Sequence, residues 1–172
     1  MDDYTIPFYS LKEGNHEYEF EAGKKFFEHF ENPDISGGSV KIKLNLHKKA
    51  TFMELDFILD GFLTVTCDRC LDSFDYRFQA KESLYVRFGD KPEEQSDKVI
   101  IIPREESRFN IAQYIYEFSA LSLPVRKVHP DNKNGQSGCN PEMLKKLEEH
   151  EAKENNTIDP RWETLLKVRN NN

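Results

Sequence analysis

The sequence predicts an α+β domain: an antiparallel β-meander forming a partly closed, barrel-like sheet, a few helices, and a helical C-terminal tail. Two patterns indicate this class. Apolar and polar residues alternate through most of the region 40–88, and helical spacing appears on either side of that region. A chain of 172 residues is long enough for one domain with an appendage. We place a single domain at residues 1–140 and a helical extension at residues 141–172.

The N-terminal part is expected to contain a strand segment and a short helix. Tyr18 and Phe20 alternate with glutamates, which is typical of a half-buried strand. Phe26, Phe27 and Phe30 then lie three to four residues apart, the spacing of one face of a helix. The Pro- and Gly-containing segment 32–38 ends that helix.

The strongest strand signal is the alternation of apolar and polar residues over residues 40–47, and residues 53–59 repeat it. The dipeptide Asp60-Gly61 follows, and it is favoured in two-residue hairpin turns because Gly adopts positive φ readily. We therefore expect a turn there and a return strand carrying Leu63 and Val65. Another long alternation over residues 74–88 completes the predicted meander of four strands.

The C-terminal half is expected to contain a loop, a short strand and helices. Residues 89–97 are polar and predict a loop, and residues 99–103 predict an apolar strand. Asn110 has the position of a helix N-cap, and a second loop is expected over residues 125–140. Proline at the first helical position is well tolerated, so helices are expected to begin at the two Asx-Pro pairs, Asn140-Pro141 and Asp159-Pro160.

Composition and charge exclude several classes of protein. The formal net charge is −7, and residues 1–37 alone carry nine acidic and three basic groups, which argues against a protein that coats nucleic acid non-specifically. No apolar run approaches the about 20 residues needed to span a bilayer, and Met1–Tyr4 begins no secretory signal. We therefore expect a cytoplasmic protein with no membrane contact and no small-molecule substrate.

The three cysteines and one histidine form the most informative constellation in the sequence. Cys67-Asp68-Arg69-Cys70 is a CxxC knuckle between predicted strands, and its two-residue spacer can direct both sulfurs at one point. Together with His129 and Cys139 in the polar loop, these cysteines would make a closed Cys3His set, the ligands of a structural Zn²⁺ site. Two other interpretations stay open, namely plain buried cysteines and a redox pair.

Motifs that carry enzymatic chemistry are missing from the sequence. It has no phosphate-binding glycine loop, no dinucleotide fingerprint, no nucleophile elbow and no HExxH. Glu105-Glu106 is best explained as surface charge, because adjacent residues on a strand point to opposite faces. We therefore expect a non-enzymatic protein.

Five motifs follow one another in the order of a known family: Cys67-Asp68-Arg69-Cys70-Leu71 with the aromatic segment Phe74–Phe78, Ile111–Glu117, Leu121-Ser122-Leu123-Pro124, His129 with Cys139, and Asp159–Leu165. On these motifs the chain resembles, over roughly residues 15–168, the YceD-like proteins, the large ribosomal RNA subunit accumulation family. It departs from the family in a longer His-to-Cys loop, with 132–138 as a polar insert. The family positions matched here are Cys67, Arg69, Cys70, Glu117, Pro124, His129 and Cys139.

The resemblance implies a bacterial, non-enzymatic factor in ribosome biogenesis that supports accumulation or processing of the large-subunit (23S) ribosomal RNA. Its partner would be that RNA or a pre-ribosomal particle. If the four ligands meet, the cations of the knuckle and the loop would share one edge and contact phosphates; these are Arg69, Arg126, Lys127 and Lys133. The alternative is a protein-interaction module or chaperone for a basic ribosomal protein, which the acidic N-terminal segment favours.

Overall fold

The computed structural model describes residues 1–89, 93–96, 98–132 and 134–150. The chain divides into two compact units. The first is Met1–Cys139 and contains the sheet, and the second begins at Asn140 and contains helix α3 (Pro141–His150). The first unit holds every cysteine of the sequence.

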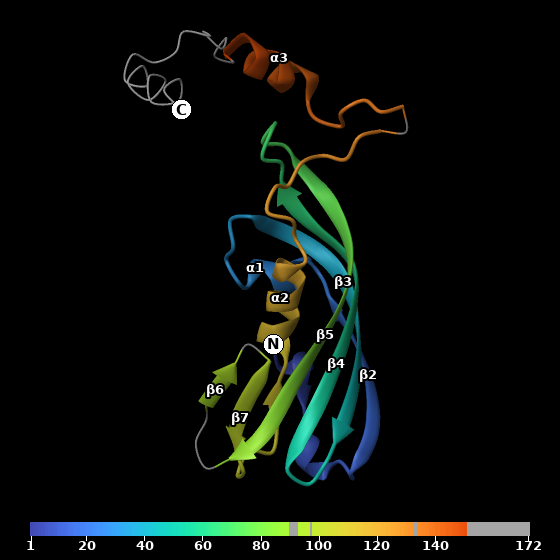
Figure 1. Cartoon of the computed structure of the whole chain (residues 1–172), viewed down its shortest axis with the longest axis vertical. Coiled ribbons are helices and arrows are strands. Elements are labelled where there is room, and N and C mark those ends of the chain that lie inside the picture. The colour runs from blue at the N-terminus through green and yellow to red at the C-terminus, as the bar shows by residue number, and fades with distance from the viewer. Residues whose placement is uncertain (90–92, 97, 133, 151–172) are drawn as a thin grey trace, which may run out of the picture. The chain divides into compact units, whose positions relative to one another are not determined.

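A six-stranded mixed sheet forms the centre of the first unit (Figure 1). Its first four strands pair as an antiparallel meander, and β7 then pairs parallel to β5 and antiparallel to β6. In spatial order the strands are β2 (Gly14–Ala22), β3 (Ile35–Lys48), β4 (Phe52–Thr66), β5 (Ser73–Gly89), β7 (Val99–Pro103) and β6 (Glu93–Ser96). The sheet is not a closed barrel, because β2 and β6 remain its two edges.

The predicted turn at Asp60-Gly61 was wrong. Both residues lie inside β4, where Gly61 pairs with Val40 on one side and Phe78 on the other. A side chain at Gly61 would place its Cβ 2.2 Å from the carbonyl oxygen of Ser39. Glycine is therefore required here because the backbone of β3 approaches closely, rather than because the chain reverses. The meander consists of four long strands, β2 to β5, and the 89–97 segment predicted as a loop contains β6.

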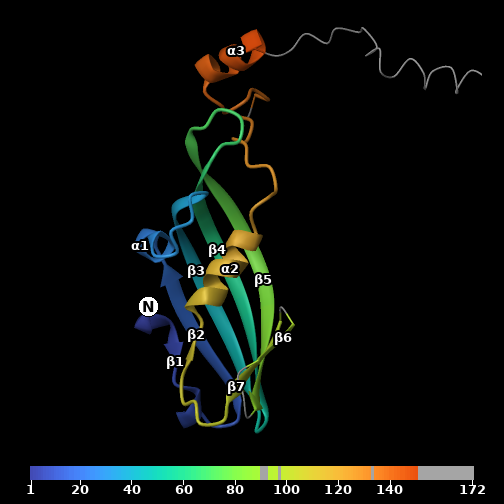
Figure 2. The same ribbon diagram turned by 90° about the vertical axis from the view of Figure 1, so that its left-hand side faces the viewer.

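The helices of the first unit lie on one face of the curved sheet, as Figures 1 and 2 both show. The predicted helix near Phe26 is confirmed as α1 (Lys24–Glu28), and the helix behind Asn110 is confirmed as α2 (Ala112–Leu121). The N-cap predicted at Asn110 was wrong by one residue: the N-cap is Ile111, and the Asn110 side-chain oxygen, one position earlier, accepts a 2.9 Å hydrogen bond from the Ala112 N–H. Two 3-10 helices, Asp2–Tyr4 and Phe8–Ser10, flank the short strand β1 (Thr5–Ile6), which pairs with β8 (Phe109–Asn110).

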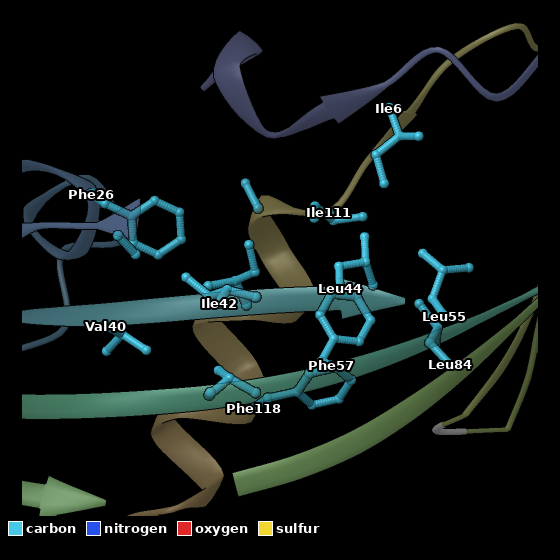
Figure 3. Close-up of a cluster of buried hydrophobic side chains, with 14 of the residues drawn as sticks. Ile6, Phe26, Val40, Ile42, Leu44, Leu55, Phe57, Leu84, Ile111 and Phe118 are labelled. Carbon is cyan, nitrogen blue, oxygen red and sulfur yellow. The ribbon is translucent and has the colours of Figure 1, made fainter. Parts of the chain in front are cut away.

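The core fills the space between α2 and the sheet (Figure 3). Phe118 of α2 packs edge-on against Phe57 of β4 with ring centroids 5.3 Å apart, a favourable aromatic arrangement. The apolar residues of the alternations predicted over 40–47 and 53–59 are buried on this face: Val40, Ile42, Leu44 and Leu46 on β3, and Met53, Leu55, Phe57 and Leu59 on β4. The period-2 pattern therefore identified the buried face correctly.

In the second unit, the helix predicted at Asn140-Pro141 is confirmed as α3. The Asn140 side chain accepts a 3.0 Å hydrogen bond from the Glu142 N–H and caps its first turn. Residues 151–172, including the helix start predicted at Asp159-Pro160, lie outside the described residues.

Candidate metal centre

The turn between β4 and β5, residues 67–72, places two cysteines close together. The Cys67 N–H donates to the Asp72 carbonyl at 3.0 Å, and the Leu71 N–H donates to the Cys67 carbonyl at 2.9 Å. Leu71 has a φ of 65°, a left-handed conformation that non-glycine residues seldom adopt. These bonds close a tight turn in which both Cys67 and Cys70 are buried.

Residues 125–132 and 134–139 lie against this turn and hold it through reciprocal hydrogen bonds. The Asp68 N–H donates to the Lys127 carbonyl at 2.7 Å, and the Lys127 N–H donates to the Asp68 carboxylate at 2.6 Å. Further along, the Ser137 hydroxyl accepts from the Arg69 guanidinium at 3.3 Å and from the Cys139 N–H at 3.2 Å. Sequence reasoning had singled out neither Asp68 nor Ser137, because only the fold brings their partners to them.

The four predicted ligand residues meet at this contact. The ligand atoms of Cys67, Cys70, His129 and Cys139 all lie within 4.8 Å of one another. The sulfurs of Cys67 and Cys139 are 3.7 Å apart, and the Cys70 sulfur is 3.4 Å from Nδ1 of His129. In a tetrahedral zinc site, Zn–S bonds of about 2.3 Å and Zn–N bonds of about 2.0–2.1 Å place two sulfurs about 3.8 Å apart and a sulfur and a nitrogen about 3.6 Å apart. The donor set and its spacing therefore fit a metal ion of the zinc type, and the four residues can hold one.

Electrostatics at the cluster favour a thiolate. Burial raises the pKa of the Cys67 thiol, but hydrogen bonds from the backbone N–H groups of Cys70, Arg69 and His129 and from the His129 ring outweigh it. They lower the pKa to about 6, below the ordinary value of 9.0. The thiolate is the form that binds metals, so Cys67 is prepared for that role at neutral pH.

The imidazole of His129 is held by an aromatic neighbour. The ring of Phe74, near the start of β5, lies against it with centroids 4.6 Å apart. This contact fixes the plane of the ring and leaves Nδ1 directed at the Cys70 sulfur.

The predicted cations do not form one uniform edge. Arg126 is exposed, and Arg69 is half-buried beside Ser137. The Lys127 side chain is only 14% exposed, and its ammonium lies 3.7 Å from Asp34 and 3.9 Å from Asp68. Lys127 therefore contributes chiefly to docking the loop. Lys133 lies outside the described residues.

A family model described as "Large ribosomal RNA subunit accumulation protein YceD" matches residues 55–169, which is 115 of 172 residues. The chain belongs to the YceD family. The matched region begins inside β4 and includes all four residues of the cysteine–histidine cluster, Cys67, Cys70, His129 and Cys139. Neither the curated proteins nor the solved structures contain a match to this chain.

The family description links this protein to the accumulation of large-subunit ribosomal RNA. Among the described residues, no helix is long and apolar enough to cross a membrane. Two features therefore occur in one chain: a family linked to ribosomal RNA, and a cluster of four side chains, from a β-turn and a distant loop, that could hold a metal ion.

Proposed function

We propose that this YceD-family protein is a non-enzymatic factor of ribosome biogenesis in the bacterial cytoplasm. It supports accumulation of the 23S ribosomal RNA by binding that RNA or a pre-ribosomal particle. The observation that carries this proposal is the family match over residues 55–169, which spans the whole cysteine–histidine cluster.

In this proposal Cys67, Cys70, His129 and Cys139 hold a structural zinc ion. A closed set of four protein ligands leaves the ion no open position for substrate, so its contribution is to cross-link the chain. Asp68 binds the backbone of Lys127, Ser137 binds the backbone of Cys139, and Phe74 lies against the His129 ring, so these residues hold the loop and its ligands in place. The loop then presents Arg126 at a fixed distance from Arg69.

Arg69 and Arg126 are the proposed phosphate contacts. A guanidinium is planar and offers paired N–H donors that match phosphate oxygens. Because the whole protein carries a net charge of −7, such contacts would be local, and binding should be selective rather than a coating of any RNA. Lys127 is the weaker candidate, since two carboxylates already neutralise its charge.

The function is tested in cells that lack the gene. We expect the level of 23S RNA to fall relative to 16S RNA, and the native chain to restore it. Affinity purification at native expression, followed by RNA sequencing and mass spectrometry, should recover large-subunit RNA. Repeating the purification after nuclease treatment separates RNA binding from protein binding, because RNA-bridged partners are lost. An unchanged 23S level in the deletion strain would refute the proposed function.

The RNA contact is tested by charge reversal with a matched control. Arg69→Glu combined with Arg126→Glu should abolish binding to a 23S transcript in gel shifts at moderate salt. Arg87→Glu combined with Arg108→Glu makes the same change in net charge at exposed arginines away from the cluster, and should leave binding intact. Equal loss in both double variants would show that only net charge matters.

A further inference from the structure

The edge strand β2 presents a row of backbone groups that the sheet does not use. Lys49 and Phe52 close the β3–β4 hairpin with a 2.9 Å backbone hydrogen bond, which makes them a hydrogen-bonded pair. Along an antiparallel ladder, hydrogen-bonded pairs alternate with pairs that are not hydrogen-bonded. The odd-numbered residues 41–47 of β3 therefore direct their N–H and C=O groups to β4, and the even-numbered residues 40–48 direct theirs to β2. The registers continue without a bulge through this stretch.

It follows that Asn15, Glu17, Glu19 and Glu21 of β2 direct their N–H and C=O groups away from the sheet. The Tyr4 hydroxyl confirms this direction, because it donates a 2.8 Å hydrogen bond to the Glu21 carbonyl from outside the ladder. Among the described residues, none forms a backbone hydrogen bond to the outward N–H or C=O groups of Asn15, Glu17 and Glu19. Figures 1 and 2 show β2 as the outermost strand of the main sheet.

Natural proteins usually protect an edge strand with charged side chains, most often lysine, or with proline, a bulge or short length. β2 is nine residues long, contains no proline, and pairs with β3 without a register shift. Its charges are the exposed carboxylates of Glu17, Glu19 and Glu21, which repel an acidic strand but attract a basic one. On the opposite face, Tyr18 and Phe20 are half-buried and stack with ring centroids 6.1 Å apart.

We propose that β2 is a docking edge for an extended, basic protein segment in which Lys or Arg alternates with apolar residues. Such a segment would add to the sheet as a seventh strand through the free backbone groups of residues 15–19. Its cations would lie opposite Glu17 and Glu19, and its apolar side chains would contact Tyr18 and Phe20. This interaction goes beyond RNA binding and gives the protein a second kind of partner.

Charge selects this occupant over the others. A second copy of the chain adding through β2 would place glutamates opposite glutamates, and like charges directly across a ladder are destabilising. A nucleic acid would bring phosphates to the same carboxylates and be repelled. Glu19 lies 3.5 Å from Lys43, but both side chains are more than two-thirds exposed, so this pair is weak and leaves the carboxylate available.

The test uses the full chain and a fluorescent synthetic peptide, Lys-Val-Lys-Val-Lys-Val-Lys, in fluorescence anisotropy. Glu17→Lys combined with Glu19→Lys should weaken binding by about tenfold or more. Glu105→Lys combined with Glu106→Lys changes the net charge equally at an exposed site elsewhere and should leave affinity within about twofold of the native chain. The same peptide residues in blocks, with the lysines first, should bind more weakly. No measurable binding, or equal loss in both double variants, would overturn the proposal.

A second pair of variants separates strand addition from simple charge attraction. The Glu19 N–H faces away from β3, so Glu19→Pro removes that free donor and leaves the ladder intact. Glu19→Gln removes the same charge and keeps the N–H. We expect Glu19→Pro to bind the peptide more weakly than Glu19→Gln, and hydrogen exchange at the amides of residues 17 and 19 to slow when peptide binds. Equal affinity of the two variants, or unchanged exchange, would overturn strand addition. Melting curves verify that each variant is folded.

Discussion

Removing one ligand of the cysteine–histidine cluster should lower the melting temperature of the first unit substantially. The clearest perturbation is Cys139→Ser, because Cys139 is the most distant ligand along the chain from Cys67. The two residues are 72 positions apart, and their sulfurs are 3.7 Å from each other. A metal that joins them closes that whole segment into a loop.

The size of the effect follows from loop closure. In the chain-entropy treatment, a cross-link over a loop of this length removes about 4 kcal/mol of unfolded-state freedom. If the metal is instead released on unfolding, free zinc at about a thousand times its Kd stabilises the folded state by about 4 kcal/mol as well. For a chain of this size, a change of about 4 kcal/mol corresponds to a fall in Tm of about 8–16 °C.

The assay is thermal unfolding followed by circular dichroism, with zinc measured on the same reductant-treated protein. The native chain should carry one zinc and lose stability on chelation, whereas Cys139→Ser should start at the lower Tm and respond little to the chelator. Ser122→Ala, at the half-buried C-terminal end of α2, changes none of the four ligands and serves as a control that should keep the metal. A native chain that carries no zinc and melts at the same temperature with and without chelator would refute the reasoning.

Three further outcomes are expected. Phe118→Ala should destabilise the fold by about 3–5 kcal/mol in urea unfolding, because it removes the ring that packs against Phe57; a loss below about 1 kcal/mol would contradict that packing. Gly61→Ala should cost about 1–3 kcal/mol or more by the same measurement, since its Cβ would lie 2.2 Å from the Ser39 carbonyl oxygen; an unchanged midpoint would argue against this close approach. Glu54→Gln should lower the raised pKa of Tyr85 toward its usual 10.0, because the Glu54 carboxylate accepts the phenol's hydrogen bond and its charge opposes ionisation. Ultraviolet titration of the variant against the native chain measures this, and identical curves would contradict it.

Local patterns predicted the strands and helices well where a single buried face decided the structure. The alternation through β3 and β4 reflects burial of every second side chain, and that can be read directly from the sequence. Asp60-Gly61 misled because the same dipeptide suits a turn and a close approach between strands, and only the neighbouring strand decides between them. The parallel pairing of β7 with β5 has no local signal, since it depends on how a distant segment returns to the sheet.

The candidate site divides in the same way. The CxxC spacing is local and directs attention to Cys67 and Cys70, and the Cys3His donor set pointed to His129 and Cys139, which the structure brings together with them. The role of Lys127 could not be predicted, because its carboxylate partner Asp34 belongs to the distant N-terminal part of the chain. A lysine or arginine identified in the sequence can contact phosphate only if folding does not pair its charge with a carboxylate.

The pairing of β1 with β8 sets an order of events during synthesis of this protein. Thr5 and Ile6 are translated before the main sheet, yet their strand partners, Phe109 and Asn110, follow more than a hundred residues later. The hairpins from β2 to β5 can form sequentially as the chain emerges, whereas the N-terminal strand must wait for most of the polypeptide. Until β8 has been translated, Ile6, which is buried in the finished fold, lacks its strand partner Phe109.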